Sequence, residues 1–192
     1  MTLHPADGPI RVLAPLSILD GQYASGMPMR WLIRETFTGG LSEEEHDERG
    51  RQWWEARQSI RPLLHSGADR LIDINVHDGI IDSLRQIEPD VVELRALIGD
   101  LQVGYEWLYA RYEGASLNIV EPGFGEAGTA FEMLRDELAL QDSFFVHSVI
   151  TWPHGEFDIV FAAVELELTP GHGQDRDALF AREEPPASRT VG

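Results

Sequence analysis

The clearest pattern in the chain is an alternation of side-chain types in its last third. β-Branched and aromatic residues occupy both faces of residues 144–152, which predicts a strand with both sides partly covered. Pro153 and Gly155 then supply turn chemistry, because proline has no amide to donate and glycine adopts positive φ without penalty. Residues 157–168 return with aliphatic residues alternating against glutamates. The pattern predicts a long C-terminal β-hairpin.

Further strand-like runs precede this hairpin, each bounded by turn residues. They cover residues 79–87, 91–98, 105–112 and 117–120. Short strands at this spacing predict an antiparallel meander. Because an isolated hairpin is marginally stable in water, we expect the C-terminal hairpin to complete the same sheet.

One helix is predicted before the meander. Ser42 is followed three residues later by Glu45, which is the capping-box pattern at a helix start, and acidic residues in the first turn suit the helix dipole. The helix should end near Ile60, because a proline follows two residues later. Its Trp53 side is expected to lie on the sheet. The sequence therefore predicts an α+β fold, an antiparallel β-meander sheet with a long C-terminal hairpin, covered by one main helix over about residues 42–61.

The two ends of the chain differ from this central part. Residues 1–28 are rich in proline, glycine and small side chains, which predicts a flexible arm, and Met27 or Met29 offers a later translation start. The polar residues 170–192 are expected to form a disordered tail. Residues 29–169 are then a single α+β domain, a size that suits one hydrophobic core.

The charge of the chain is strongly unbalanced. It has 33 acidic residues against 15 basic ones, all arginine, for a formal charge of -18. Nucleic acid and anionic membranes are therefore excluded as partners, since a polyanion requires a cationic surface. A basic protein is the partner that such a field attracts. The alternative is that the charge serves only to keep the protein soluble.

Other features of composition point to the cytoplasm. The chain has no cysteine, which excludes disulfides and thiolate metal sites. It contains no run of about 20 apolar residues, the length that a membrane helix needs, and no signal-peptide pattern. Gly123, Gly125 and Gly128 lack the following lysine and the strand–loop–helix context of a phosphate loop, so no bound nucleotide is expected.

Histidine and aspartate side chains are concentrated between residues 65 and 82. The group comprises His65, Asp69, Asp73, His77, Asp78 and Asp82. Imidazole nitrogens and carboxylate oxygens suit zinc, manganese or non-haem iron. His65, Asp69, His77 and Asp78 are therefore a candidate divalent-metal site, the one cofactor the sequence suggests. The alternative is structural: Asp78 caps a turn and His77 bonds a backbone carbonyl, since the pair precedes a predicted strand.

Two candidate binding surfaces lie on predicted strands. Tyr105, Trp107 and Tyr109 share one strand face, where they either form an exposed stacking surface or are covered by the Trp53 helix. His147 lies in the first hairpin strand, and Asp136, Glu137 and Asp142 precede it. If these carboxylates fold back, a His–carboxylate pair is available for acid–base chemistry; the alternative is a core histidine bonded to one acid.

The order of these motifs resembles that of a known group of proteins. An Arg-Trp-rich start, GGLSEEE, VHDG and a meander are followed by LRDELALQDSFFVHSVITWPHGEFDIVFAAVEL. This resembles uncharacterised bacterial proteins of the domain-of-unknown-function type over residues 29–169. The resemblance rests on Asp136-Glu137, His147 and the strand end at Glu165-Leu166, and it implies an α+β or β-rich fold with no assigned activity.

Two functional hypotheses follow from the sequence. The first is a non-enzymatic cytoplasmic bacterial protein, of accessory or immunity type, whose acidic surface binds a basic protein. It accounts for the charge, the single domain and the lack of a complete catalytic motif. The second is a metal-dependent hydrolase using His65, Asp69, His77 and Asp78.

Overall fold

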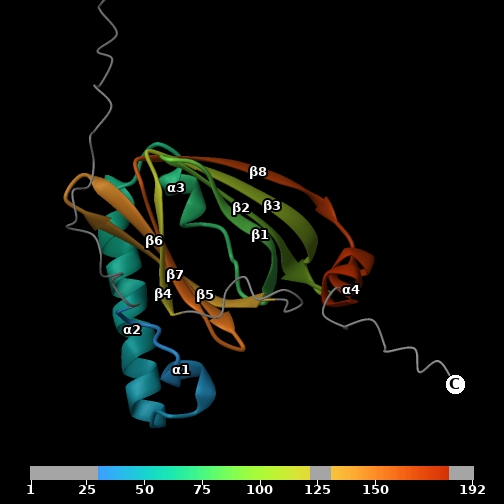
Figure 1. Ribbon diagram of the computed structural model, residues 1–192. Coiled ribbons are helices and arrows are strands. Elements are labelled where there is room, and N and C mark those ends of the chain that lie inside the picture. Colours follow the sequence, from blue (N-terminus) through green and yellow to red (C-terminus); the bar gives the residue numbers. More distant parts are fainter. Residues whose placement is uncertain (1–29, 122–130, 182–192) are drawn as a thin grey trace, which may run out of the picture.

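Eight antiparallel strands form one sheet in the computed structural model, which describes residues 30–121 and 131–181 (Figure 1). The strands are β1 (Gly79–Glu88), β2 (Val91–Asp100), β3 (Gly104–Glu113), β4 (Ser116–Glu121), β5 (Phe131–Gln141), β6 (Phe144–Trp152), β7 (Glu156–Phe161) and β8 (Ala163–Gly171). Their order across the sheet is β4-β7-β6-β5-β1-β2-β3-β8. The predicted antiparallel sheet is confirmed, and it dominates the α+β fold.

The helices are few and mostly short. They are α1 (Glu35–Thr38), α2 (Glu43–Ile60), the 3-10 turn η1 (Arg61–Leu63), α3 (Ala68–Leu71) and α4 (Gly173–Ala181). The predicted capping box is confirmed at the start of α2. The amide of Glu45 donates to Ser42 Oγ at 3.3 Å, and the amide of Ser42 donates to Glu45 Oε2 at 3.0 Å.

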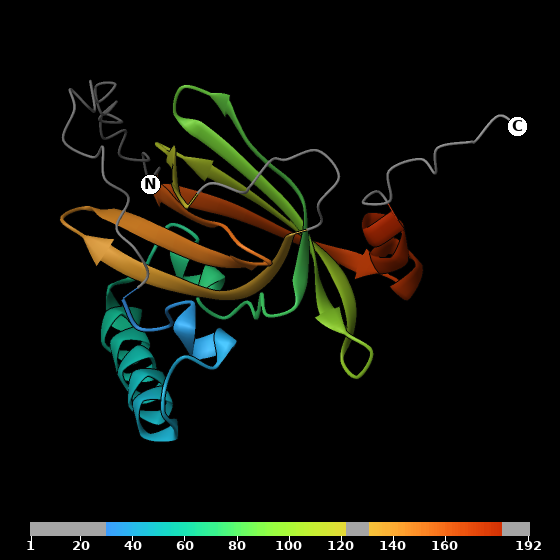
Figure 2. The same cartoon turned by 60° about the horizontal axis from the view of Figure 1, so that its bottom comes forward.

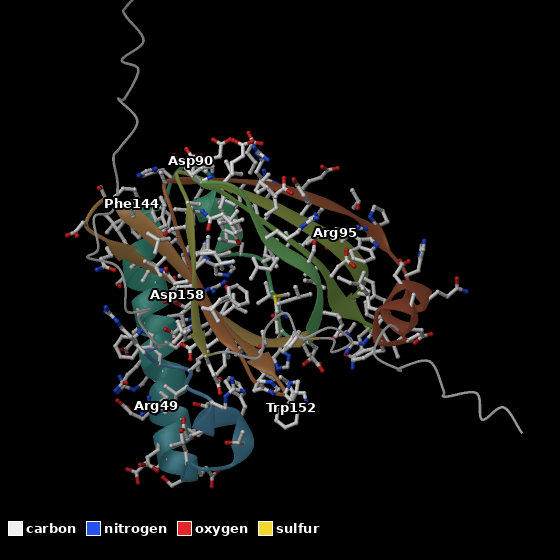
Figure 3. All side chains as sticks on the ribbon, in the orientation of Figure 1. Arg49, Asp90, Arg95, Phe144, Trp152 and Asp158 are labelled. Atoms are coloured by element: carbon white, nitrogen blue, oxygen red, sulfur yellow. The ribbon has the colours of Figure 1, made fainter. Side chains whose placement is uncertain are left out.

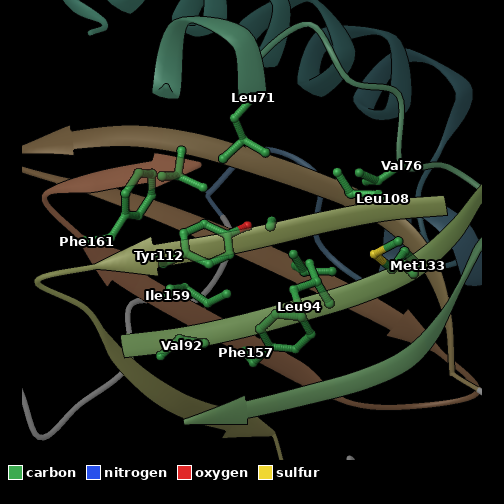
Figure 4. Close-up of a cluster of buried hydrophobic side chains, with 14 of the residues drawn as sticks. Leu71, Val76, Val92, Leu94, Leu108, Tyr112, Met133, Phe157, Ile159 and Phe161 are labelled. Carbon is green, nitrogen blue, oxygen red and sulfur yellow. The ribbon is translucent and has the colours of Figure 1, made fainter. Parts of the chain in front are cut away.

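The sheet is bent into two halves that enclose the core. β1 pairs with β5 only between Gly79–Ile81 and Phe131–Met133. Beyond these residues the strands diverge, so that β1, β2, β3 and β8 curve to face β4, β5, β6 and β7 (Figure 1). The buried side chains between the halves include Leu94, Leu108, Tyr112, Met133, Phe157 and Phe161, with Leu71 of α3 above them (Figure 4). Apolar burial of this kind contributes about 25 cal/mol per Å².

The C-terminal hairpin differs from its prediction in the return arm. β6 matches the expected strand, but the return divides into β7 and β8, which lie in opposite halves of the sheet. β7 pairs with β6 and β4, whereas β8 pairs with β3. The chain changes halves at Ala162, whose amide donates to Glu113 O at 3.0 Å. The core-facing positions change phase at this bend, from Phe157, Ile159 and Phe161 before it to Val164 and Leu166 after it.

The expected disordered tail is wrong for residues 170–181. β8 continues to Gly171, and α4 follows with Leu179 only 4% exposed. Arg176 of α4 donates to Asp78 O at 2.7 Å, which ties the helix to the start of β1. Residues 182–192 and the predicted N-terminal arm, residues 1–28, lie outside the described residues.

The main helix covers less of the sheet than expected. α2, all of whose residues the structure describes, contains no buried side chain. It lies against β5, in the half of the sheet away from β2, β3 and β8 (Figures 1 and 2). Its anchor is Trp53, whose indole Nε1 donates to Asp136 O at 3.3 Å.

A single carboxylate fixes the segment that leads into α1. Glu137 of β5 is 8% exposed and accepts hydrogen bonds from the backbone amides of Arg30 at 3.0 Å, Trp31 at 2.8 Å and Leu32 at 2.7 Å. Leu32 then packs against Ile150 of β6. A buried carboxylate requires hydrogen-bond donors. The three amides therefore satisfy Glu137, and the same bonds fix the position of residues 30–32.

We expect Glu137→Ala to lower the free energy of unfolding by about 3 kcal/mol, because hydrogen bonds to a charged group contribute about 1.5–3 kcal/mol each and do not add fully. Urea denaturation followed by tryptophan fluorescence measures the loss. The control is Glu167→Ala on the exposed face of β8, which should change stability by less than about 0.5 kcal/mol. Equal stabilities for the two variants would show that the Glu137 hydrogen bonds contribute nothing.

Candidate functional site

Three polar side chains from different strands meet inside the sheet. His147 of β6 is fully buried, with Nδ1 2.8 Å from the Tyr112 hydroxyl of β3. Its Nε2 lies 3.3 Å from Asp136 Oδ2 of β5, at ion-pair distance but outside hydrogen-bonding geometry. Of the carboxylates considered from the sequence, the structure brings Asp136 to His147, whereas Glu137 binds the Arg30–Leu32 amides.

Burial decides what this group can do. Tyr112 and His147 have no exposed surface, so neither ring can touch a substrate in this conformation. Burial, followed by the nearby Asp136 charge, raises the pKa of the Tyr112 phenol far above its usual value. The phenol therefore stays protonated. We assign the ring proton of His147 to Nε2, on the side of the Asp136 carboxylate, which leaves Nδ1 to accept from the phenol. The arrangement fits a buried polar network that fixes the positions of three strands.

The raised pKa of Tyr112 makes stability depend on alkaline pH. The pKa of the Tyr112 phenol is higher in the folded protein than the value of about 10 in the unfolded chain. Its contribution to the free energy of unfolding is therefore complete below pH 10 and is lost as the pH rises above 10, by about 1.4 kcal/mol per pH unit. We expect Tyr112→Phe to cost about 1–2 kcal/mol at pH 8, because His147 Nδ1 loses its donor. The same variant should lose less stability than the wild type between about pH 10 and 11.

Urea unfolding at the three pH values measures both effects, with Tyr105→Phe as the matched control. The control should keep the pH dependence of the wild type. An identical alkaline slope in Tyr112→Phe and wild type would refute the assignment of that slope to Tyr112.

The four candidate metal ligands form local contacts and do not gather into one site. His65 Nδ1 lies 2.9 Å from Ser66 Oγ, and its ring meets the edge of Phe145. Asp69 accepts from the amide of Gly67 at 3.1 Å. His77 and Asp78 contact each other. Across residues 30–121 and 131–181, no three histidine or acidic side chains are grouped to hold a metal ion.

We expect protein purified without chelator to carry far less than one metal ion per chain, because the candidate ligands do not converge. Elemental analysis by mass spectrometry measures the content, and protein treated with chelator is the control. A near-stoichiometric divalent metal that His77→Ala removes would restore the hydrolase hypothesis.

The aromatic row is covered by an element that the sequence reasoning missed. Tyr105 and Trp107 pack with Leu179 of α4, not with the Trp53 helix. Arg95, labelled in Figure 3, lies 4.3 Å above the Trp107 ring. The Tyr109 hydroxyl donates to Glu93. The sequence signal for the start of α4 was Asp175, an acidic residue in its first turn. Its carboxylate accepts a hydrogen bond from the amide of His172 at 2.8 Å.

Exposed carboxylates gather on the first turns of α2. Glu43, Glu44 and Asp47 are exposed, on the part of the helix that extends past the sheet (Figure 2). Glu45 belongs to the capping box, and Glu48 pairs with Arg51 at 2.6 Å. The first group is therefore the acidic surface that local bonding leaves available.

Half of the arginines that the structure describes are paired with carboxylates. Each of six arginines contacts a carboxylate within 4.0 Å: Arg34, Arg51, Arg61, Arg95, Arg111 and Arg176. Each pair neutralises one acidic and one basic charge, so pairing leaves the formal net charge at -18.

Comparisons with protein-family models, with curated proteins and with solved structures each found no match. The resemblance to uncharacterised bacterial proteins therefore stays a prediction. Within the described part of the chain, no helix has the length and apolar character needed to cross a membrane.

Proposed function

We propose that this protein is a non-enzymatic binding protein of the bacterial cytoplasm, of accessory or immunity type, whose partner is a basic protein. The observation that carries the proposal is the exposed acidic start of α2, formed by Glu43, Glu44 and Asp47. It belongs to a chain with a formal charge of -18, in which half of the described arginines are paired with carboxylates.

Electrostatics give this surface a physical role. A surface of one sign raises the association rate with an oppositely charged partner and repels like-charged ones. The Debye length falls from about 10 Å at 0.1 M salt to about 3 Å at 1 M, so such an encounter weakens as salt rises. Tyr112 and His147, the polar pair with the side chains best suited to acid–base chemistry, are enclosed in the core, which favours binding over catalysis.

The proposal predicts a partner whose capture depends on salt and on α2. Tagged protein incubated with host lysate should retain a basic protein at about 0.05 M salt and lose it at about 0.5 M. The triple variant Glu43→Gln, Glu44→Gln and Asp47→Asn should reduce recovery at least about tenfold, equivalent to about 1.4 kcal/mol. Quantitative mass spectrometry of the captured protein measures the recovery.

The matched control removes three charges elsewhere, with Glu106→Gln, Glu165→Gln and Glu167→Gln. Circular dichroism checks that α2 remains folded in both variants. If both lose the partner equally, net charge alone is responsible and the α2 surface is not the site. Absence of any basic partner at low salt would overturn the proposed function itself.

A further inference from the structure

A pocket opens where the two halves of the sheet separate. Pairing between β1 and β5 ends at Met133, and the indole of Trp53 takes the place of a neighbouring strand by donating to Asp136 O. The pocket has a volume of about 350 Å³, within the range of about 300–1,000 Å³ typical of small-molecule sites. Its lining includes Trp53, Arg57, Asp73, Asn75, Arg135 and Asp136.

The two pocket arginines differ from most others in the protein. Among the residues that the structure describes, the side chains of Arg57 and Arg135 form no ion pair within 4.0 Å, although the charge of Asp136 acts on Arg135 and the charge of Arg57 acts on Asp73. Burial lowers the pKa of the Arg135 guanidinium, the direction expected when a cation is desolvated without a full counter-charge. An anion between these side chains would supply that counter-charge.

The pocket carboxylates also lie close to side chains other than the two pocket arginines. Asp73 is paired with Arg61 at 2.5 Å, and Asp136 lies 3.3 Å from His147 Nε2. With Arg61, which pairs with Asp73 at the edge of the pocket, three guanidiniums lie near two carboxylates. This is a local positive charge in a protein that is strongly negative overall.

The remaining lining residues restrict the shape of a ligand. The Arg57 guanidinium lies over the Trp53 ring, 5.2 Å from its centroid, which is a cation–π contact. Asn75 Oδ1 accepts from the amide of His77 at 3.2 Å, which leaves the NH₂ group of Asn75 as the donor end of that side chain. The indole of Trp53 is a surface that a planar ring can contact, and the donors suit an oxyanion.

We propose that this pocket binds a small organic oxyanion, a carboxylate or phosphate monoester attached to a flat ring, held by Arg57 and Arg135. The planar fork of arginine matches both oxyanions with paired N–H donors. The ring packs against Trp53. This site is separate from the Glu43, Glu44 and Asp47 surface and does not depend on a protein partner.

Isothermal titration calorimetry at low salt tests the proposal with phenyl phosphate and benzoate as probes, and with neutral benzamide as the control ligand. At least one anion should bind saturably at one site per chain, with a Kd below about 1 mM, and benzamide should not. Arg57→Gln and Arg135→Gln should each weaken binding at least about tenfold. Arg85→Gln, an equal charge change on exposed β1, should leave it unchanged.

Binding of phenyl phosphate alone identifies a phosphate site, and binding of benzoate alone identifies a carboxylate site. Thermal unfolding without ligand verifies that each variant is folded. The proposal is overturned if neither anion binds saturably, or if Arg57→Gln and Arg135→Gln bind as tightly as Arg85→Gln. Partner capture by α2 can succeed or fail independently, because its variants leave this pocket intact.

Discussion

The bend between β1 and β5 is the constraint on which the rest of the structure depends. A flat eight-stranded sheet would expose one apolar face, whereas bending it brings Leu94 and Leu108 of one half against Phe157 and Phe161 of the other. The bend limits pairing between β1 and β5 to three residues on each strand. The fold therefore gives up backbone hydrogen bonds at one place to bury its core.

Polar side chains compensate for the lost pairing and hold the peripheral segments. Trp53 bonds the free edge of β5, and Glu137 binds the amides of the segment before α1. Arg34 donates to Thr151 O at 2.9 Å and to Gly155 O at 3.0 Å, which fixes the turn between β6 and β7. Because buried polar groups are costly when unpaired, these contacts specify one arrangement of the chain. The separation of β5 from β1 also leaves room for the Arg57 and Arg135 pocket.

Local patterns predicted the elements that depend on local physics. The alternation of Val92, Leu94 and Ala96 matched a buried face of β2, and Ser42 began α2 as its capping box indicated. β5 was obscured, because Asp136 and Glu137 make its middle polar. Both carboxylates have tertiary partners, so their burial does not appear in hydropathy. Among the residues that the structure describes, the candidate ligands do not form a group that could hold a metal ion, because adjacency in sequence does not make side chains converge.

The sequence by itself determined the strand and helix periods, the turn residues and the excess of negative charge, because these depend on neighbours along the chain or on composition alone. Only the tertiary structure decided that Ala162 crosses between halves, that α4 covers the aromatic row, and which polar groups meet. Leu32 and Glu137, for example, are bonded across a separation of 105 residues. Such contacts depend on the curvature of the whole sheet, and that curvature follows from burying the apolar sides of its two halves against each other.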